Sequence, residues 1–89
     1  MRLKSGFVLE EVGGTFLAVA VGERAEEFKV LIKLNRTGAF LWRAIAERDM
    51  SEPELADEIV ARYEVSREIA ERDVRSFVKI IRDGGLLDD

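Results

Sequence analysis

The sequence changes character once, because residues 7–34 have the composition and patterning of strands, whereas residues 35–85 place their apolar residues at helical spacing. Residues 7–12 and 15–21 are rich in β-branched and aromatic side chains, and only Gly13 and Gly14 separate them. A loop of two glycines supplies the positive φ angles that a tight hairpin turn needs. Alternating apolar residues at 28–34 predict a third strand. The simplest arrangement is an antiparallel meander with the second strand in the middle.

Three helices are predicted after the strands, each preceded by a residue suited to cap its amino end. These caps are Asn35, Ser51 and Ser66. Ser51 and Glu54 also have the spacing of a capping box, in which each side chain satisfies a free backbone N–H. The glycine pair at 84–85 is expected to end the third helix. The order β-β-β-α-α-α predicts an α+β, winged-helix-like fold, and the whole chain of 89 residues is expected to be one domain.

The composition excludes most kinds of catalysis. The chain has neither histidine nor cysteine, which removes the commonest general base and the usual zinc ligands. Its adjacent acidic pairs lack the spacing of a calcium loop, and its glycine pairs are not set in a phosphate-binding pattern. We therefore expect no catalytic residue, no metal ion and no cofactor, in a protein that is not itself an enzyme.

The net charge and the hydropathy pattern limit the cellular compartments and the kinds of partner that suit this chain. The chain carries 14 basic and 18 acidic residues, a net charge of −4, which does not suit a protein that coats phosphates. The longest apolar run, at residues 16–21, is too short to span a bilayer, and the first residues do not resemble a signal peptide. Without cysteine the chain suits a reducing compartment. We therefore expect a cytoplasmic protein.

The third predicted strand has one edge with no partner. Its apolar residues alternate with Lys29, Leu31 and Lys33. Lysines often protect an exposed strand edge from pairing with another chain. If Lys29 and Lys33 have this protective role, the edge has no binding function. In the alternative, a peptide adds to this edge as a further strand, its main chain completing the ladder. A scaffold that dimerises or docks a protein through the edge is another alternative, so monomer and homodimer both remain open.

The third predicted helix has an apolar arc wider than one-sided packing requires. Ala70, Val74, Phe77, Val78 and Ile81 form one stripe. Ile69, Asp73, Ser76 and Ile80 lie along its flank, and the two isoleucines widen the arc to roughly 180°. These isoleucines either complete a small core or form one wall of a groove whose other wall is the third strand.

The opposite face of this helix carries the basic residues Arg72, Arg75, Lys79 and Arg82. A winged-helix protein could place such a face on DNA, which makes nucleic-acid binding the alternative function. However, Glu68 lies four residues before Arg72, and Glu71 lies four residues before Arg75, an order that neutralises the basic face and supports the helix. With a net negative charge and no basic wing, a solvated face is favoured.

Three parts of the sequence together resemble the PqqD family. They are the block at residues 34–42, the opening at residues 4–9 with its glycine turn, and the closing run of Asp73-Val74, Phe77-Val78 and Gly85-Leu86-Leu87. The resemblance covers essentially the whole chain. It implies a winged-helix-like domain that binds the leader segment of a ribosomally made precursor peptide and presents it to a separate modifying enzyme, often a radical-SAM protein.

The resemblance also implies where the leader docks. It would add as a strand along Val30, Leu31, Ile32 and Lys33. The helical wall of the site would be formed by Ile69, Asp73, Phe77 and Ile80. Asp73 could pair with a basic leader residue, and Lys29 or Lys33 with an acidic one. Family members that act in quinone-cofactor synthesis share this fold with members that act on other peptides, so the pathway stays open.

Overall fold

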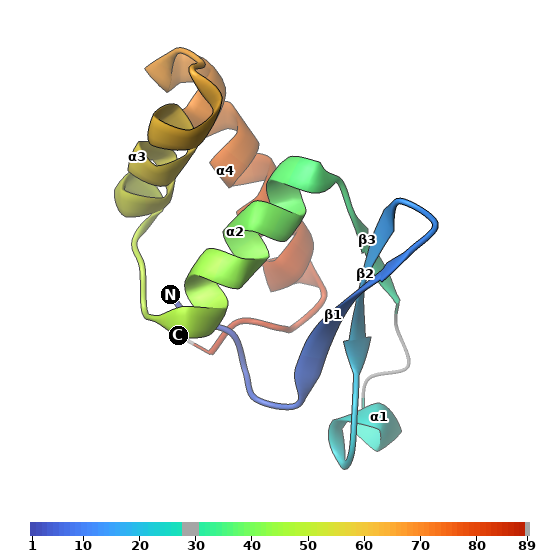
Figure 1. Cartoon of the computed structure of the whole chain (residues 1–89). Helices are drawn as coiled ribbons and strands as arrows, with labels where there is room; N and C mark the ends of the chain where they lie inside the picture. Colours follow the sequence, from blue (N-terminus) through green and yellow to red (C-terminus); the bar gives the residue numbers. More distant parts are fainter. Residues whose placement is uncertain (28–30, 89) are drawn as a thin grey trace.

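The computed structural model describes residues 1–27 and 31–88. A small sheet lies on one side, α2 and α4 lie beside it, and α3 lies beyond them (Figure 1). The elements in chain order are β1 (Phe7–Val12), β2 (Thr15–Ala20), α1 (Arg24–Glu27), β3 (Ile32–Leu34), α2 (Arg36–Glu47), α3 (Glu52–Tyr63) and α4 (Arg67–Asp83). The predicted α+β class is confirmed, with the sheet followed by three long helices.

The sheet has the predicted order β1-β2-β3 and is antiparallel throughout. Val12 lies opposite Thr15, so the loop between β1 and β2 consists of Gly13 and Gly14 alone. Their φ angles are 56° and 81°, the two positive values that define a type I′ turn. Glycine adopts these angles without the steric cost of a Cβ, which explains why this pair forms the turn.

The third strand is shorter than predicted among the described residues. Its pairing with β2 extends over Ile32–Leu34, and Leu31 precedes the strand without regular structure. The remaining predicted positions, 28–30, lie outside the described residues. Ile32 and Leu34 are buried and Lys33 is exposed, which confirms the alternation for the part of the strand that is described.

A single helical turn, α1, lies where the sequence predicted only a polar connection. The N–H of Ala25 donates to the carbonyl of Gly22 at 3.1 Å, and Nε of Arg24 donates to the carbonyl of Ser5 at 3.0 Å. One turn with a single small apolar residue, Ala25, has no apolar periodicity for a pattern to detect. The order of elements is therefore β-β-α-β-α-α-α rather than the simpler order predicted.

The predicted helix caps are all present. The Asn35 side chain accepts a hydrogen bond from the Gly38 N–H at 2.7 Å, and Ser66 Oγ accepts one from the Ile69 N–H at 3.2 Å. Before α3, Ser51 Oγ accepts from the Glu54 N–H at 3.2 Å, and a Glu54 carboxylate oxygen accepts from the Ser51 N–H at 3.0 Å. These bonds satisfy backbone donors that the first helical turn leaves unpaired.

The carboxyl end of α4 turns the chain back onto the core. The Leu86 N–H donates to the carbonyl of Ile81 and the Gly85 N–H to that of Arg82, both at 3.0 Å, which is a Schellman motif. Gly85 has a φ of 79°, the left-handed conformation that this motif requires. The chain then pairs with the amino-terminal segment, because the Lys4 N–H donates to the Leu86 carbonyl at 2.9 Å. Figure 1 shows the two termini close together.

The buried side chains form one cluster, to which β2, β3 and the helices α2, α3 and α4 contribute, while the partly buried Phe7 and Leu9 of β1 pack against it. Its largest fully buried members include Leu41, Ile45, Leu55, Ile59 and Ile81. Because α4 reaches both the sheet side and α3, its apolar stripe is the centre of the core. In the described parts of the chain, no helix is both long enough and apolar enough to cross a membrane.

The capping box predicts an acid-sensitive contribution to stability. The hydrogen bond from the Ser51 N–H lowers the pKa of Glu54, so this group stabilises the fold above its unfolded pKa of about 4.3 and loses that effect as the pH falls through its folded pKa. Glu54→Gln keeps an acceptor oxygen and removes the charge. We expect the melting temperature of the wild type to exceed that of the variant near pH 7 and the gap to close near pH 3. A gap that stays constant in circular-dichroism melts would contradict this assignment.

Candidate functional site

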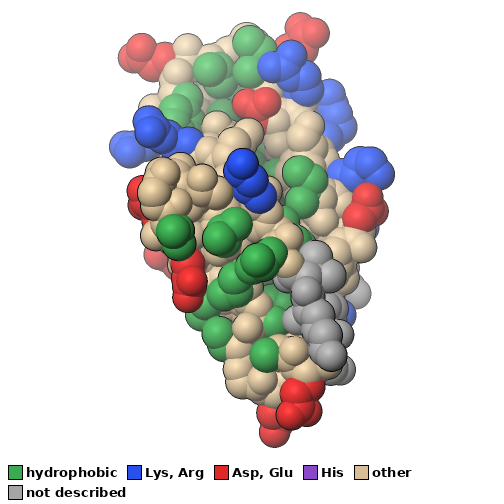
Figure 2. All heavy atoms as spheres, turned by 90° about the vertical axis from the view of Figure 1, so that its right-hand side faces the viewer, with side chains coloured by type: hydrophobic (Ala, Val, Ile, Leu, Met, Phe, Trp, Pro, Cys, Tyr) green, Lys and Arg blue, Asp and Glu red, His purple; other side chains and the backbone are tan. Residues whose placement is uncertain are grey.

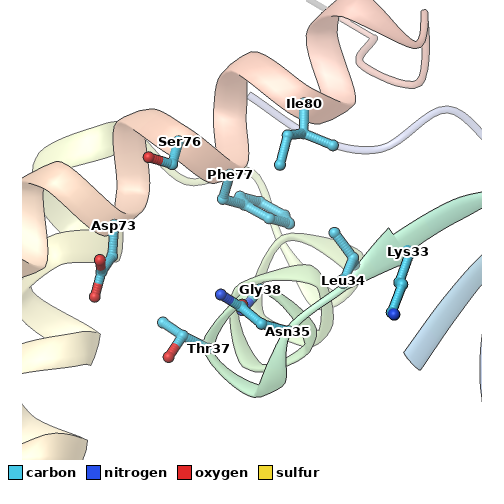
Figure 3. A pocket seen from close by; sticks show the side chains of 9 residues that line it. All are labelled: Lys33, Leu34, Asn35, Thr37, Gly38, Asp73, Ser76, Phe77 and Ile80. Carbon is cyan, nitrogen blue, oxygen red and sulfur yellow. The ribbon is translucent and has the colours of Figure 1, made fainter. Parts of the chain in front are cut away.

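A groove opens between the edge strand and the last helix. It has a volume of about 440 Å³ and lies between β3, the first turn of α2 and one face of α4 (Figure 3). We call it the β3–α4 groove. Its lining residues are Lys33, Leu34, Asn35, Thr37, Gly38, Asp73, Ser76, Phe77 and Ile80.

The strand and the helix run in opposite directions along this groove. The start of β3 lies at the carboxyl end of α4, because a Cβ added to Gly84 would stand 2.7 Å from Cδ1 of Ile32. The end of β3 leads directly into α2, where a Cβ added to Gly38 would stand 3.3 Å from Cβ of Leu34. The small residue at position 38 thus lets the first turn of α2 lie close against the strand.

One end of the groove is apolar. Leu34 and Phe77 are buried, with Phe77 only 3% exposed, whereas Ile80 leaves 45% of its surface in water. Figure 3 shows these three side chains facing one another. The sequence pattern left open whether Ile80 completes the core or forms a groove wall. The structure leaves Ile80 exposed at this end of the groove, whereas Phe77 belongs to the buried stripe.

The other end of the groove is polar and acidic. Figure 3 shows Thr37 and Asp73 together at this end, with Ser76 on the helix above them. The Asp73 side chain is 34% exposed, and its Oδ1 lies 3.9 Å from Nε of Arg72, at the outer limit of an ion pair. Asn35 is held as the cap of α2 and belongs to the framework of the groove.

The backbone of β3 presents Lys33 to the open edge. The Val21 N–H donates to the Gly6 carbonyl at 2.8 Å, and in an antiparallel ladder such bonded pairs alternate with unbonded ones. Following the register from this pair, alternate residues of β2, including Ala18, direct their backbone groups at β3. The N–H and C=O of Ile32 and Leu34 then face β2, and those of Lys33 face outward. Among the described residues, no strand lies beyond this edge.

The groove brings together four of the site residues predicted from the sequence, namely Lys33, Asp73, Phe77 and Ile80. Lys29 and Val30 lie outside the described residues. Leu31 is 63% exposed just before β3, and Ile32 is buried within it. Ile69 is 39% exposed on α4, one turn before Asp73, and does not line this groove. Peptide contacts of all these residues, including the four that line the groove, stay predictions.

Sequence reasoning missed the strand–helix junction as part of the site. The sequence patterns assign Asn35 to a helix cap and Leu34 to the alternating strand, and neither pattern indicates a place in the site. Thr37 and Gly38 lie inside the block that carries the family resemblance, which was the one available signal. Their position in the groove depends on how α2 leaves the sheet, which no local pattern specifies.

The basic face of α4 is balanced by acidic side chains. Nζ of Lys79 donates to a carboxylate oxygen of Asp83 at 2.9 Å. A carboxylate oxygen of Glu71 accepts from Nε of Arg67 at 3.1 Å. Glu71 therefore pairs with the arginine one turn before it, and not, as predicted, with Arg75, one turn after it. On the molecular face that Figure 2 shows, Lys and Arg are interspersed with Asp and Glu, and hydrophobic side chains gather over its lower half. On that face, the mixed charges do not form the continuous basic surface that phosphate binding requires.

Comparison with known proteins identifies the family. Residues 23–87 match the family described as coenzyme PQQ synthesis protein D (PqqD). The chain belongs to the PqqD family. A search of curated proteins found no matching sequence. The family match covers β3 and α4 and therefore includes the whole β3–α4 groove.

Two solved structures share the fold of this PqqD-family chain. One is TbiB1 in complex with the TbiA(beta) leader peptide, at 23% identity and a TM-score of 0.73, covering 99% of this chain and 95% of that one. The other is lasso peptide synthetase B1 complexed with the leader peptide, at 22% identity and a TM-score of 0.69, covering 96% of this chain and 93% of that one. At these identities the likeness establishes the fold, and neither match supports the nucleic-acid alternative.

Proposed function

We propose that this protein binds the leader segment of a ribosomally synthesised precursor peptide and presents it to a separate modifying enzyme. The observation that carries the proposal is the outward-facing backbone of Lys33, which lies in the same groove as the half-exposed Ile80, on an edge of β3 with no further strand among the described residues. Membership of the PqqD family supports it, as do two proteins of the same fold that are complexes with leader peptides.

Strand addition accounts for both parts of the site. Each ladder hydrogen bond contributes about 0.5–1.5 kcal/mol net, and burying apolar surface on Ile80 contributes at about 25 cal/mol per Å². These gains offset the entropy lost when the leader becomes ordered. A binding free energy on the order of −8 to −12 kcal/mol, corresponding to micromolar to nanomolar affinity, is consistent with such a site.

In this proposal the protein supplies no catalytic group. The sequence has no histidine or cysteine, and the described residues contain no group of three or more potential metal ligands. The chemistry would belong to the partner enzyme, for which the family resemblance suggests a radical-SAM protein. The lack of cysteine remains the reason to expect a cytoplasmic location, and a monomer and a homodimer both remain compatible with the site.

Hydrogen exchange at the edge strand tests the proposal. The probe is the synthetic leader half of a precursor-like peptide, to be sought in the reading frames that neighbour the gene, and it is titrated by calorimetry and then by NMR. We expect the Lys33 amide to exchange quickly in the free protein and to become protected in the complex. The amides of Ile32 and Leu34 serve as internal controls, because they already pair with β2. Binding that leaves Lys33 exchange unchanged would exclude strand addition at β3.

A further inference from the structure

We infer that the β3–α4 groove selects leaders in which a basic residue stands two positions before a bulky apolar residue. The basic side chain would lie at Asp73, and the apolar side chain among Leu34, Phe77 and Ile80. This inference rests on the proposed function and adds the sequence feature that the groove recognises.

The spacing follows from the alternation of strands and the rise of helices. A peptide residue opposite Leu34 in an added strand has its side chain on the same face as Leu34, toward α4. The next residue on that face is two positions away, about 6.6 Å along the strand. Asp73 precedes Phe77 by four residues, about 6 Å along α4. If one side chain of the peptide lies beside Phe77, the peptide side chain two positions away therefore lies beside Asp73.

The order of the two residues follows from the direction of β3. The strand runs toward α2, that is, toward the end of the groove where Thr37 and Asp73 lie together (Figure 3). We take the added strand to be antiparallel, the slightly more stable pairing. Such a strand begins at the Asp73 end and continues toward Ile80. The basic residue must then precede the apolar one.

The charges around the polar end favour a cation there. Asp73 is partly buried, and an apolar ligand side chain would remove more of its water without giving it a partner. Its contact with Arg72 is long, at 3.9 Å, and Arg72 is exposed, so it can move aside. Lys33 lies at the other end of the groove (Figure 3). The amino end of α2 attracts anions, but Asn35 already caps it, and an acidic ligand would face the Asp73 carboxylate.

The experiment is a selection from a display library of random dodecapeptides, carried out on the wild type and on Asp73→Lys. We expect the wild type to enrich Lys or Arg two positions before Phe, Leu or Ile. Asp73→Lys should enrich Asp or Glu at that same position, with the apolar preference retained. For an individual selected peptide, exchanging the basic residue for Glu should weaken wild-type binding about three- to tenfold, the scale of a partly exposed ion pair.

Two comparisons separate this inference from the proposed function. Glu47→Lys makes the same charge change at an exposed residue in the last turn of α2, outside the groove, and should select the same peptides as the wild type. Two results would refute this inference and leave the proposed function intact. In the first, the selected peptides share the apolar residue but show no charge preference two positions before it. In the second, they show a charge preference that Asp73→Lys does not reverse. If no selected peptide binds the wild type more tightly than it binds Ile80→Asp, the proposed function itself fails.

Discussion

Ile80→Asp is expected to weaken leader-peptide binding about 100-fold while the protein stays folded. The substitution removes an apolar contact and places a carboxylate against Leu34 and Phe77, where the bound peptide would exclude water. Loss of the contact and desolvation of the charge together cost about 3 kcal/mol of binding free energy. The fold should tolerate the change, because Ile80 is already 45% exposed in the free protein.

The matched control for this variant is Val60→Asp. Val60 is an exposed apolar residue on α3 and lies outside the groove, so the same chemical change there should leave leader affinity within about twofold. Calorimetry measures both affinities, and the helical circular-dichroism signal checks both folds. Equal affinity for wild type and Ile80→Asp would remove α4 from the site and would contradict the proposed function, which depends on Ile80. Ile69→Asp adds a third comparison, because a loss there would show that the leader extends beyond Asp73 along α4.

N-methylation of a single leader residue, the one that pairs with Lys33, is expected to weaken binding about tenfold to 100-fold. In an antiparallel pair of this kind the two residues exchange both N–H···O bonds. The added methyl group removes the peptide's donor and prevents close approach of the strands, which costs about 1.5–3 kcal/mol, including the unpaired carbonyl of Lys33.

The two adjacent leader residues provide the control within the same peptide. Their N–H groups point away from β3, so N-methylation there should change affinity less than about threefold. A scan along the leader, measured by fluorescence anisotropy, should therefore give alternating strong and weak effects with period two. Equal effects at all positions would mean that the peptide binds by its side chains or in a helical conformation.

Interactions between residues close in the sequence were sufficient to predict most of the fold. The Gly13-Gly14 turn, the caps at Asn35 and Ser66, and the capping box at Ser51 each depend on neighbouring residues in the chain, and each is present as predicted. The helix α1 was not predicted because a single turn of four residues is too short to show an apolar periodicity. The length of β3 was overestimated among the described residues, since alternation extends to Leu31 but pairing with β2 does not.

The sequence by itself determined which residues alternate, which helices form and where they begin, because these properties arise from contacts within a few residues. It also marked Ile80 as one apolar residue more than a simple stripe requires. Only the tertiary structure decided that Ile80 remains in water while Phe77 is sealed, and that Asp73 lies beside Thr37 at one end of a groove. Those facts depend on the angle at which α4 crosses β3 and the start of α2. That angle is set by the packing of the whole core and has no local signature in the chain.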